Sequence, residues 1–184
     1  MHELAKNQTK NNLMVFQAEN EIAAANMAIG ASFAGARVMT GTSGGGFDLM
    51  GEALSFQGIS EIPLTVYLAS RPGPGTGVPT YTAQGDLDIA LRSGHGEFPR
   101  VVIAPGNSIE TIEKTSEALL LAEKFRTLSI ILGDKHLAES EFSSIEEPAK
   151  TTRIKIDRIV PGENLVKNSS YETDKFGNST ESYS

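Results

Sequence analysis

Charged residues follow two of the apolar runs that predict strands: two glutamates after the first, and an arginine after a later one. Glu19 and Glu21 follow an apolar run at 13–16 and open a helical pattern. Each is therefore either a partner of the helix dipole or a carboxylate aimed into a cleft. Arg71 follows the apolar run at 62–69. Its guanidinium suits either a loop salt bridge or the binding of a carboxylate or phosphate.

A glycine-rich stretch at 41–45, Gly-Thr-Ser-Gly-Gly, matches the G-x-S-x-G pattern of a nucleophile elbow around Ser43. A serine hydrolase would also need a histidine base and an orienting acid. Only His95 and His136 follow Ser43 in the sequence. The alternative is a tight turn that lets the start of a helix approach a ligand, and both interpretations stay open at this point.

Short apolar runs alternate with helical patterns along the first 140 residues. This alternation predicts an α/β fold, a parallel sheet with helices on both faces. Active sites in such sheets collect at the carboxyl ends of the strands. The expected strands are 13–16, 37–42, 62–69, 101–103 and 128–132, and the expected helices are 19–34, 47–56, 84–92 and 108–124, the last capped by Ser108.

Composition excludes several kinds of site. The chain has 184 residues, a net charge of −7 and no cysteine. Without cysteine it cannot itself hold an iron–sulfur cluster or a disulfide. The acidic balance argues against nucleic acid or an anionic membrane as a partner. The longest uncharged stretch, 22–36, is shorter than the about 20 residues of a membrane span, and no signal peptide is evident, so we expect a cytoplasmic protein.

The last part of the chain differs from the rest. Residues 150–160 alternate charged and apolar side chains and predict one exposed or edge strand, and 168–184 are polar. We therefore expect an α/β domain over 1–139 and a linker with a polar tail over 140–184.

Several stretches together resemble one family. The run QAENEIAA at 17–24, followed by MAIGASFAGAR at 27–37, resembles the α subunit of 2-oxoacid:ferredoxin oxidoreductases, most closely the 2-oxoglutarate type. The resemblance covers roughly residues 4–139 in order. It continues through 42–44, 71–74, 84–87, 94–100, 104–106 and 132–135.

The resemblance implies a pyrimidine-binding domain for thiamine diphosphate. Glu21 matches the glutamate that faces N1′ of the aminopyrimidine, and is thus the expected catalytic residue. Arg71 matches an arginine that faces the substrate carboxylate. Thr42, Ser43 and Gly44 would line the cofactor cleft.

The resemblance also implies partners. A β subunit would hold the diphosphate, Mg²⁺ and an iron–sulfur cluster, so this chain is expected to supply no metal ligand. CoA would accept the acyl group, and ferredoxin would accept the electrons drawn from a small 2-oxoacid.

The chain departs from the family pattern in three ways. It has Ser-Gly-Gly-Gly at 43–46 where Ser-Gly-Pro-Gly is common. The family begins earlier, with a strand and a Tyr-Pro-x-Thr-Pro-Ser turn, and continues into another domain, so we expect a chain truncated at both ends. The alternative to an enzyme is a non-catalytic fragment or a structural interaction domain.

Overall fold

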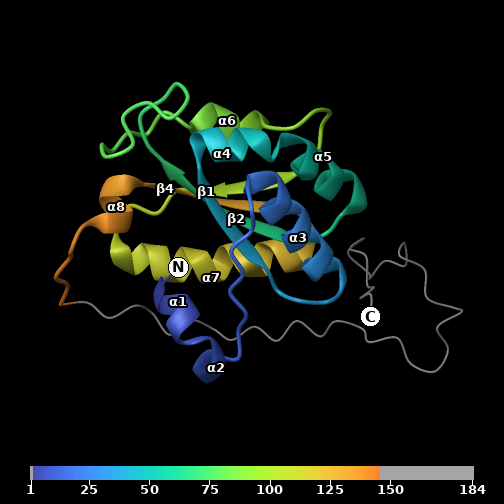
Figure 1. The fold of residues 1–184 in the computed structure, drawn as a ribbon, viewed down its shortest axis with the longest axis horizontal. Helices are drawn as coiled ribbons and strands as arrows, with labels where there is room; N and C mark the ends of the chain where they lie inside the picture. The colour runs from blue at the N-terminus through green and yellow to red at the C-terminus, as the bar shows by residue number, and fades with distance from the viewer. Residues whose placement is uncertain (1, 146–184) are drawn as a thin grey trace, which may run out of the picture.

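The strands form a single parallel sheet. The structure is a computed structural model that describes residues 2–145. Its four strands lie in the order β1-β2-β4-β3 (Figure 1). They are β1 (Met39–Ser43), β2 (Leu64–Ser70), β3 (Arg100–Ile103) and β4 (Leu128–Asp134). The predicted α/β class with a parallel sheet is confirmed.

One predicted strand is absent. Residues 13–18 have no regular secondary structure, and Met14 and Phe16 expose 87% and 64% of their surface. A strand needs a neighbouring strand to pair its backbone groups, and in the described part of the chain this segment has none. The backbone amide of Val15 instead donates a hydrogen bond to the side-chain oxygen of Gln8, Oε1, at 2.7 Å. The prediction of a strand at 13–16 was therefore wrong.

Apolar side chains of the central strands form the main core on one face of the sheet. Leu64, Val66 and Leu68 of β2 alternate with residues that point to the other face, as the two-residue period of a strand requires. Four helices cover this core: α3 (Glu21–Phe33), α4 (Gly44–Leu49), α5 (Gly51–Ser60) and α6 (Leu87–Arg92). The opposite face is covered by α7 (Ser108–Phe125), below the sheet in Figure 1.

Two helices are capped by asparagines that the sequence analysis did not single out. Asn107, not Ser108, caps α7, because its backbone is extended and its Oδ1 accepts from the amide of Glu110 at 2.8 Å. Asn20 caps α3 in the same way and accepts from Ala23 at 2.9 Å. Helix α3 therefore starts at Glu21, which leaves Glu19 outside it.

The expected helix at 47–56 is two helices. Met50 ends α4 and precedes α5, and its side chain is fully buried. Three further short helices were not predicted individually: α1 (His2–Lys6), α2 (Gln8–Asn11) and α8 (Lys135–Glu139).

Four predictions from the sequence are left untested. The strand at 150–160 and the polar tail lie outside the described residues, and the division at residue 139 stays a prediction. Within residues 2–145, no helix is long and apolar enough to cross a membrane. The cytoplasmic location likewise stays a prediction.

Two leucines on neighbouring helices test the core. Leu54 in α5 is fully buried, and Leu49 in α4 is 54% exposed. We expect Leu54→Ala to lower the free energy of unfolding by about 2–5 kcal/mol, since it removes buried methyl groups and leaves a cavity. The matched control, Leu49→Ala, should change it by about 0.5 kcal/mol or less. Urea unfolding of both variants measures the difference, and equal losses would contradict this description of the core.

Candidate active site

Three glycines, Gly44 to Gly46, form the first turn of α4 directly after β1, at the carboxyl edge of the sheet, and are called the glycine turn below. Ser43 ends the strand, and Gly44 is the first residue of the helix. Ser43 is paired in register with Ala69, near the end of β2. The glycine turn and the residues that follow β2 therefore lie at the same edge, where parallel α/β proteins bind ligands.

Glu21 lies directly against this turn. A Cβ placed on Gly46 would be 2.6 Å from Glu21 Cγ and 2.8 Å from its Oε1, and would overlap Thr42 Oγ1. Glu21 is half-buried at the first position of α3. Two predicted site residues, Glu21 and Thr42, are thus brought together around a glycine that must lack a side chain.

A second carboxylate, which the sequence analysis did not single out, approaches the same turn. A Cβ on Gly44 would lie 2.9 Å from each carboxylate oxygen of Asp86. Asp86 precedes α6 but makes no side-chain cap there, and its Oδ2 is buried without a hydrogen-bond partner in the described part of the chain. A buried, unpaired carboxylate oxygen is costly, so a donor from a ligand or water would stabilise it. The only signal in the sequence was the stretch 84–87, to which no role was given.

Arg71 stands at the end of β2, one residue beyond Ser70. It is half-buried, and within residues 2–145 its guanidinium makes no hydrogen bond or ion pair. The sequence left open a loop salt bridge or the binding of a carboxylate or phosphate by Arg71, and within residues 2–145 the salt bridge has no acidic partner. The loop after Arg71 is exposed from 73 to 80, and its Gly75 carbonyl oxygen lies 3.7 Å from where a Cβ of Gly45 would be. The loop thus leads from Arg71 to the glycine turn.

Neither histidine could serve as a base for Ser43. His95 Nδ1 lies 3.1 Å from Ser55 Oγ, and His136 Nδ1 lies 3.0 Å from Ser140 Oγ. Both imidazoles are thus paired with other serines, and within residues 2–145 Ser43 has no histidine partner. The geometry gives no support to a serine hydrolase at Ser43.

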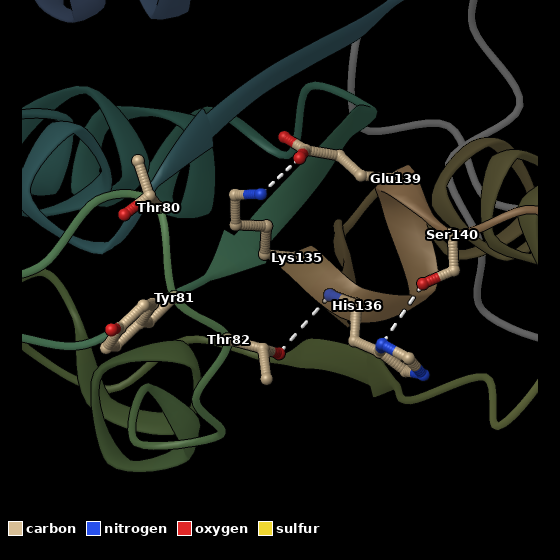
Figure 2. A pocket seen from close by; sticks show the side chains of 7 residues that line it. All are labelled: Thr80, Tyr81, Thr82, Lys135, His136, Glu139 and Ser140. Carbon is tan, nitrogen blue, oxygen red and sulfur yellow. Dashed lines mark hydrogen bonds and ion pairs between the residues drawn. The ribbon is translucent and has the colours of Figure 1, made fainter.

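An open pocket of about 590 Å³ lies between the exposed loop and α8, which follows the carboxyl end of β4 (Figure 2). It contains none of the site residues predicted from the sequence. Every residue that lines it carries a polar or charged group: Thr80, Tyr81, Thr82, Lys135, His136, Glu139 and Ser140.

Comparison with known families identifies the fold that presents these residues. Residues 1–177 match the family described as pyruvate flavodoxin/ferredoxin oxidoreductase, thiamine diphosphate-binding. The chain belongs to this family. The match spans the glycine turn, both carboxylates and Arg71, so the candidate site lies wholly within the thiamine diphosphate-binding part of the family.

Individual relatives are α subunits of larger enzymes. The chain is 45% identical over 167 residues to the 2-oxoacid:ferredoxin oxidoreductase subunit alpha of Saccharolobus solfataricus, covering 91% of this chain and 26% of that one. It is 40% identical over 159 residues to the 2-oxoglutarate synthase subunit KorA of Archaeoglobus fulgidus, covering 81% of this chain and 46% of that one. The chain therefore spans about a quarter of the length of the first relative and under half of the second.

A solved structure has the same fold. The 2-oxoglutarate:ferredoxin oxidoreductase from Magnetococcus marinus, with 2-oxoglutarate, coenzyme A and succinyl-CoA bound, superposes with a TM-score of 0.72 at 41% identity. The superposition covers 74% of this chain and 24% of that chain. The resemblance to 2-oxoglutarate-type α subunits is thus confirmed in both sequence and fold.

Adjacent glycines of the turn provide a matched pair for testing its geometry. We expect Gly46→Ala to lower the free energy of unfolding by about 1–3 kcal/mol, since its methyl group would displace Thr42 and Glu21. Gly45→Ala meets only an ordinary contact and should be neutral or stabilising by about 0.5–1 kcal/mol, because alanine favours the helix. Urea unfolding of both variants measures this contrast. A Gly46→Ala chain as stable as Gly45→Ala would show that the close approach of Glu21 is not required.

Proposed function

We propose that this chain is part of the α subunit of a 2-oxoacid:ferredoxin oxidoreductase of the 2-oxoglutarate type. In this proposal it helps bind the aminopyrimidine of thiamine diphosphate, and the assembled enzyme decarboxylates a 2-oxoacid oxidatively with CoA. The main support is the position of Glu21 against the glycine turn, in a chain of a thiamine diphosphate-binding family. The names of the α-subunit relatives agree with it.

The residues at the turn fit an aminopyrimidine. The glycines let the carboxylates of Glu21 and Asp86 come close to the backbone, and Thr42, Ser43 and Gly44 would line the space for a flat ring. An aminopyrimidine has an amino group that can donate a hydrogen bond to a carboxylate, and two ring nitrogens that can accept one from a protonated carboxyl group. The buried Oδ2 of Asp86 has no partner within residues 2–145, so beside the glycine turn it is available to accept a hydrogen bond from such an amino group.

Glu21 is the proposed catalytic residue. Thiamine diphosphate, when bound, supplies the electron sink that lets a 2-oxoacid lose its carboxylate as CO₂. Glu21 would hold a proton at N1′ of the aminopyrimidine. A carboxylate suits this role because it can share a proton with a weakly basic ring nitrogen, and its place at the start of α3 fixes its direction.

Arg71 is the proposed substrate-binding residue. A guanidinium can donate two parallel hydrogen bonds to one carboxylate, and that of Arg71 makes no ion pair within residues 2–145. Every 2-oxoacid has a carboxylate next to its carbonyl carbon. Arg71 would therefore orient the substrate without distinguishing 2-oxoglutarate from other 2-oxoacids.

The rest of the reaction requires other components. The chain has no cysteine, so we propose that an iron–sulfur cluster, together with Mg²⁺ and the diphosphate site, belongs to a β subunit. Electrons would pass through that cluster to ferredoxin. CoA is proposed as the acyl acceptor, because the related Magnetococcus marinus structure was solved with coenzyme A and succinyl-CoA bound.

Replacing Glu21 tests the proposed function. In the assembled α/β enzyme, Glu21→Gln should lower 2-oxoacid-dependent viologen reduction by about 100-fold or more, because an amide cannot hold the proton at N1′. Glu19→Gln is the matched control, since Glu19 is exposed and lies outside α3, and it should retain activity.

Unchanged turnover in Glu21→Gln would overturn the role of this residue. A chain that neither pairs with a β subunit nor takes up thiamine diphosphate in a titration would favour the alternative, a non-catalytic fragment or interaction domain.

Replacing Arg71 tests substrate binding. We expect Arg71→Gln to raise KM for the 2-oxoacid by about 10- to 100-fold, because a charge-assisted, two-point contact with the carboxylate is lost. Arg92→Gln, on the exposed surface of α6, is the matched control and should leave KM unchanged. Steady-state kinetics at varied 2-oxoacid concentration measures both. If the two variants share one KM, Arg71 does not bind the substrate.

A further inference from the structure

Asp134 lies where both ends of the loop that begins with Arg71 meet. At the start of the loop, Ser70 is paired in register with Asp134 across the β2–β4 ladder, and Arg71 is the next residue. At the end of the loop, Gln84 Nε2 donates a hydrogen bond to Asp134 Oδ2 at 2.9 Å. One residue of β4 therefore closes a loop of fourteen residues, 71–84.

The same carboxylate also fixes the helix that follows. Asp134 Oδ1 accepts from the amide of Leu137 at 2.7 Å and so caps α8. The hydrogen bond from Leu137 and then that from Gln84 hold the pKa of Asp134 below its ordinary value. The acceptor is therefore ionised at neutral pH, and hydrogen bonds to a charged acceptor are the stronger kind.

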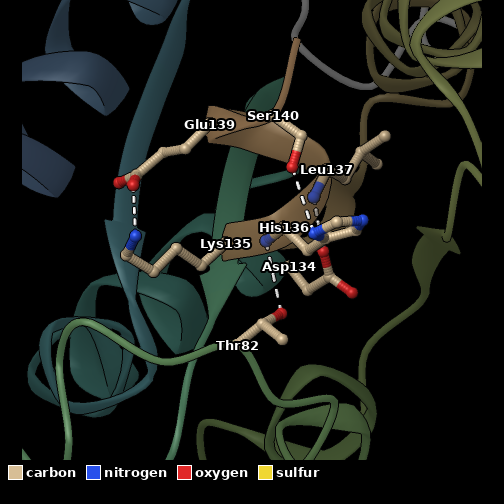
Figure 3. Close-up of polar contacts among 7 residues, drawn as sticks. All are labelled: Thr82, Asp134, Lys135, His136, Leu137, Glu139 and Ser140. Atoms are coloured by element: carbon tan, nitrogen blue, oxygen red, sulfur yellow. Dashed lines mark hydrogen bonds and ion pairs between the residues drawn. The ribbon is translucent and has the colours of Figure 1, made fainter. Parts of the chain in front are cut away.

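A second hydrogen bond joins the loop to α8. Thr82 Oγ1 accepts from the amide of His136 at 3.2 Å, beside the Asp134 carboxylate (Figure 3). With the Gln84 bond, it ties the end of the loop to the junction of β4 and α8 at two neighbouring points.

Little packing holds the loop besides these bonds. Residues 73–80 are all exposed, and the open pocket of about 590 Å³ separates Thr80 and Tyr81 from Lys135 and Glu139 of α8 (Figure 2). A loop without buried apolar contacts opens easily. Its position therefore depends on the polar contacts at its two ends.

We infer that Asp134 is a positioning residue for Arg71: by accepting from Gln84, it holds loop 71–84 closed so that the guanidinium stays at the carboxyl edge, near the glycine turn. The inference rests on the proposed function, in which Arg71 binds the substrate carboxylate. Asp134 itself touches neither substrate nor cofactor in this scheme. Its effect is on how often Arg71 is in place.

Gln84 donates this hydrogen bond and Asp134 accepts it, so the donor and the acceptor can be exchanged between the two positions. Gln84→Ala removes the donor but leaves the cap of α8 intact. Gln84→Glu sets two carboxylates against each other. In Gln84→Glu combined with Asp134→Asn, the new amide can donate to the new carboxylate, while asparagine still caps α8.

In the assembled α/β enzyme, we expect Gln84→Ala and Gln84→Glu to raise KM for the 2-oxoacid by about tenfold, the loss of one hydrogen bond to a charged group. The change in kcat and in thiamine diphosphate affinity should be much smaller. Hydrogen–deuterium exchange of segment 72–84 should rise in both variants. The double variant should restore KM and exchange toward the wild-type values. Glu139→Gln, which breaks the Lys135–Glu139 ion pair on α8 but not the loop contact, is the control and should leave KM unchanged.

Arg71→Gln, measured in parallel, separates this inference from the function on which it rests. If Arg71→Gln raises KM but the Gln84 variants do not, the positioning role of Asp134 is wrong and the proposed function stands. If Arg71→Gln also leaves KM unchanged, the substrate role of Arg71 is wrong, and the inference fails with it. A double variant with KM no better than Gln84→Glu would show that the bond between these two side chains is not what holds the loop.

Discussion

Glu21 and Asp86 approach the glycine turn, the first turn of α4, more closely than residues with a Cβ would allow. The space next to Gly46 is filled by Glu21 and Thr42, and that next to Gly44 by Asp86. Two side chains far apart in the sequence, those of Glu21 and Asp86, therefore converge with Thr42 on a backbone that has no side chains of its own. This arrangement packs polar groups closely around the backbone of the turn, which is what a binding site for a polar heterocycle needs.

The order of the strands determines which groups share this edge. Because β2 lies between β1 and β4, the end of β2 is flanked by Ser43 on one side and Asp134 on the other. The loop that leaves β2 with Arg71 can therefore reach the glycine turn with Gly75 and return to β4 with Gln84. The candidate site and the contacts that hold its loop are consequences of a single sheet topology.

Hydrophobic periodicity predicted the helices and strands that bury a continuous apolar face. It failed where strand pairing or helix capping determines the structure. The central strands and α7 were found close to their expected places, since β2 and β4 are apolar enough to be recognised alone. The segment at 13–16 has the composition of a strand but no neighbouring strand in the described residues. Asn107, found where Ser108 was expected, shows that which of two adjacent polar residues caps a helix depends on backbone geometry that composition does not reveal.

The sequence by itself determined the α/β class and the family, and it singled out Glu21, Thr42 and Arg71 as candidate site residues, because ordered motifs and apolar periodicity are local properties of the chain. Only the tertiary structure decided that Asp86 faces the same turn as Glu21, that His95 and His136 are paired away from Ser43, and that Asp134 joins both ends of the Arg71 loop. Apart from the local pairing of His136 with Ser140, these are contacts between residues 40 or more positions apart in the chain. Their existence depends on strand order and register, which no local pattern specifies.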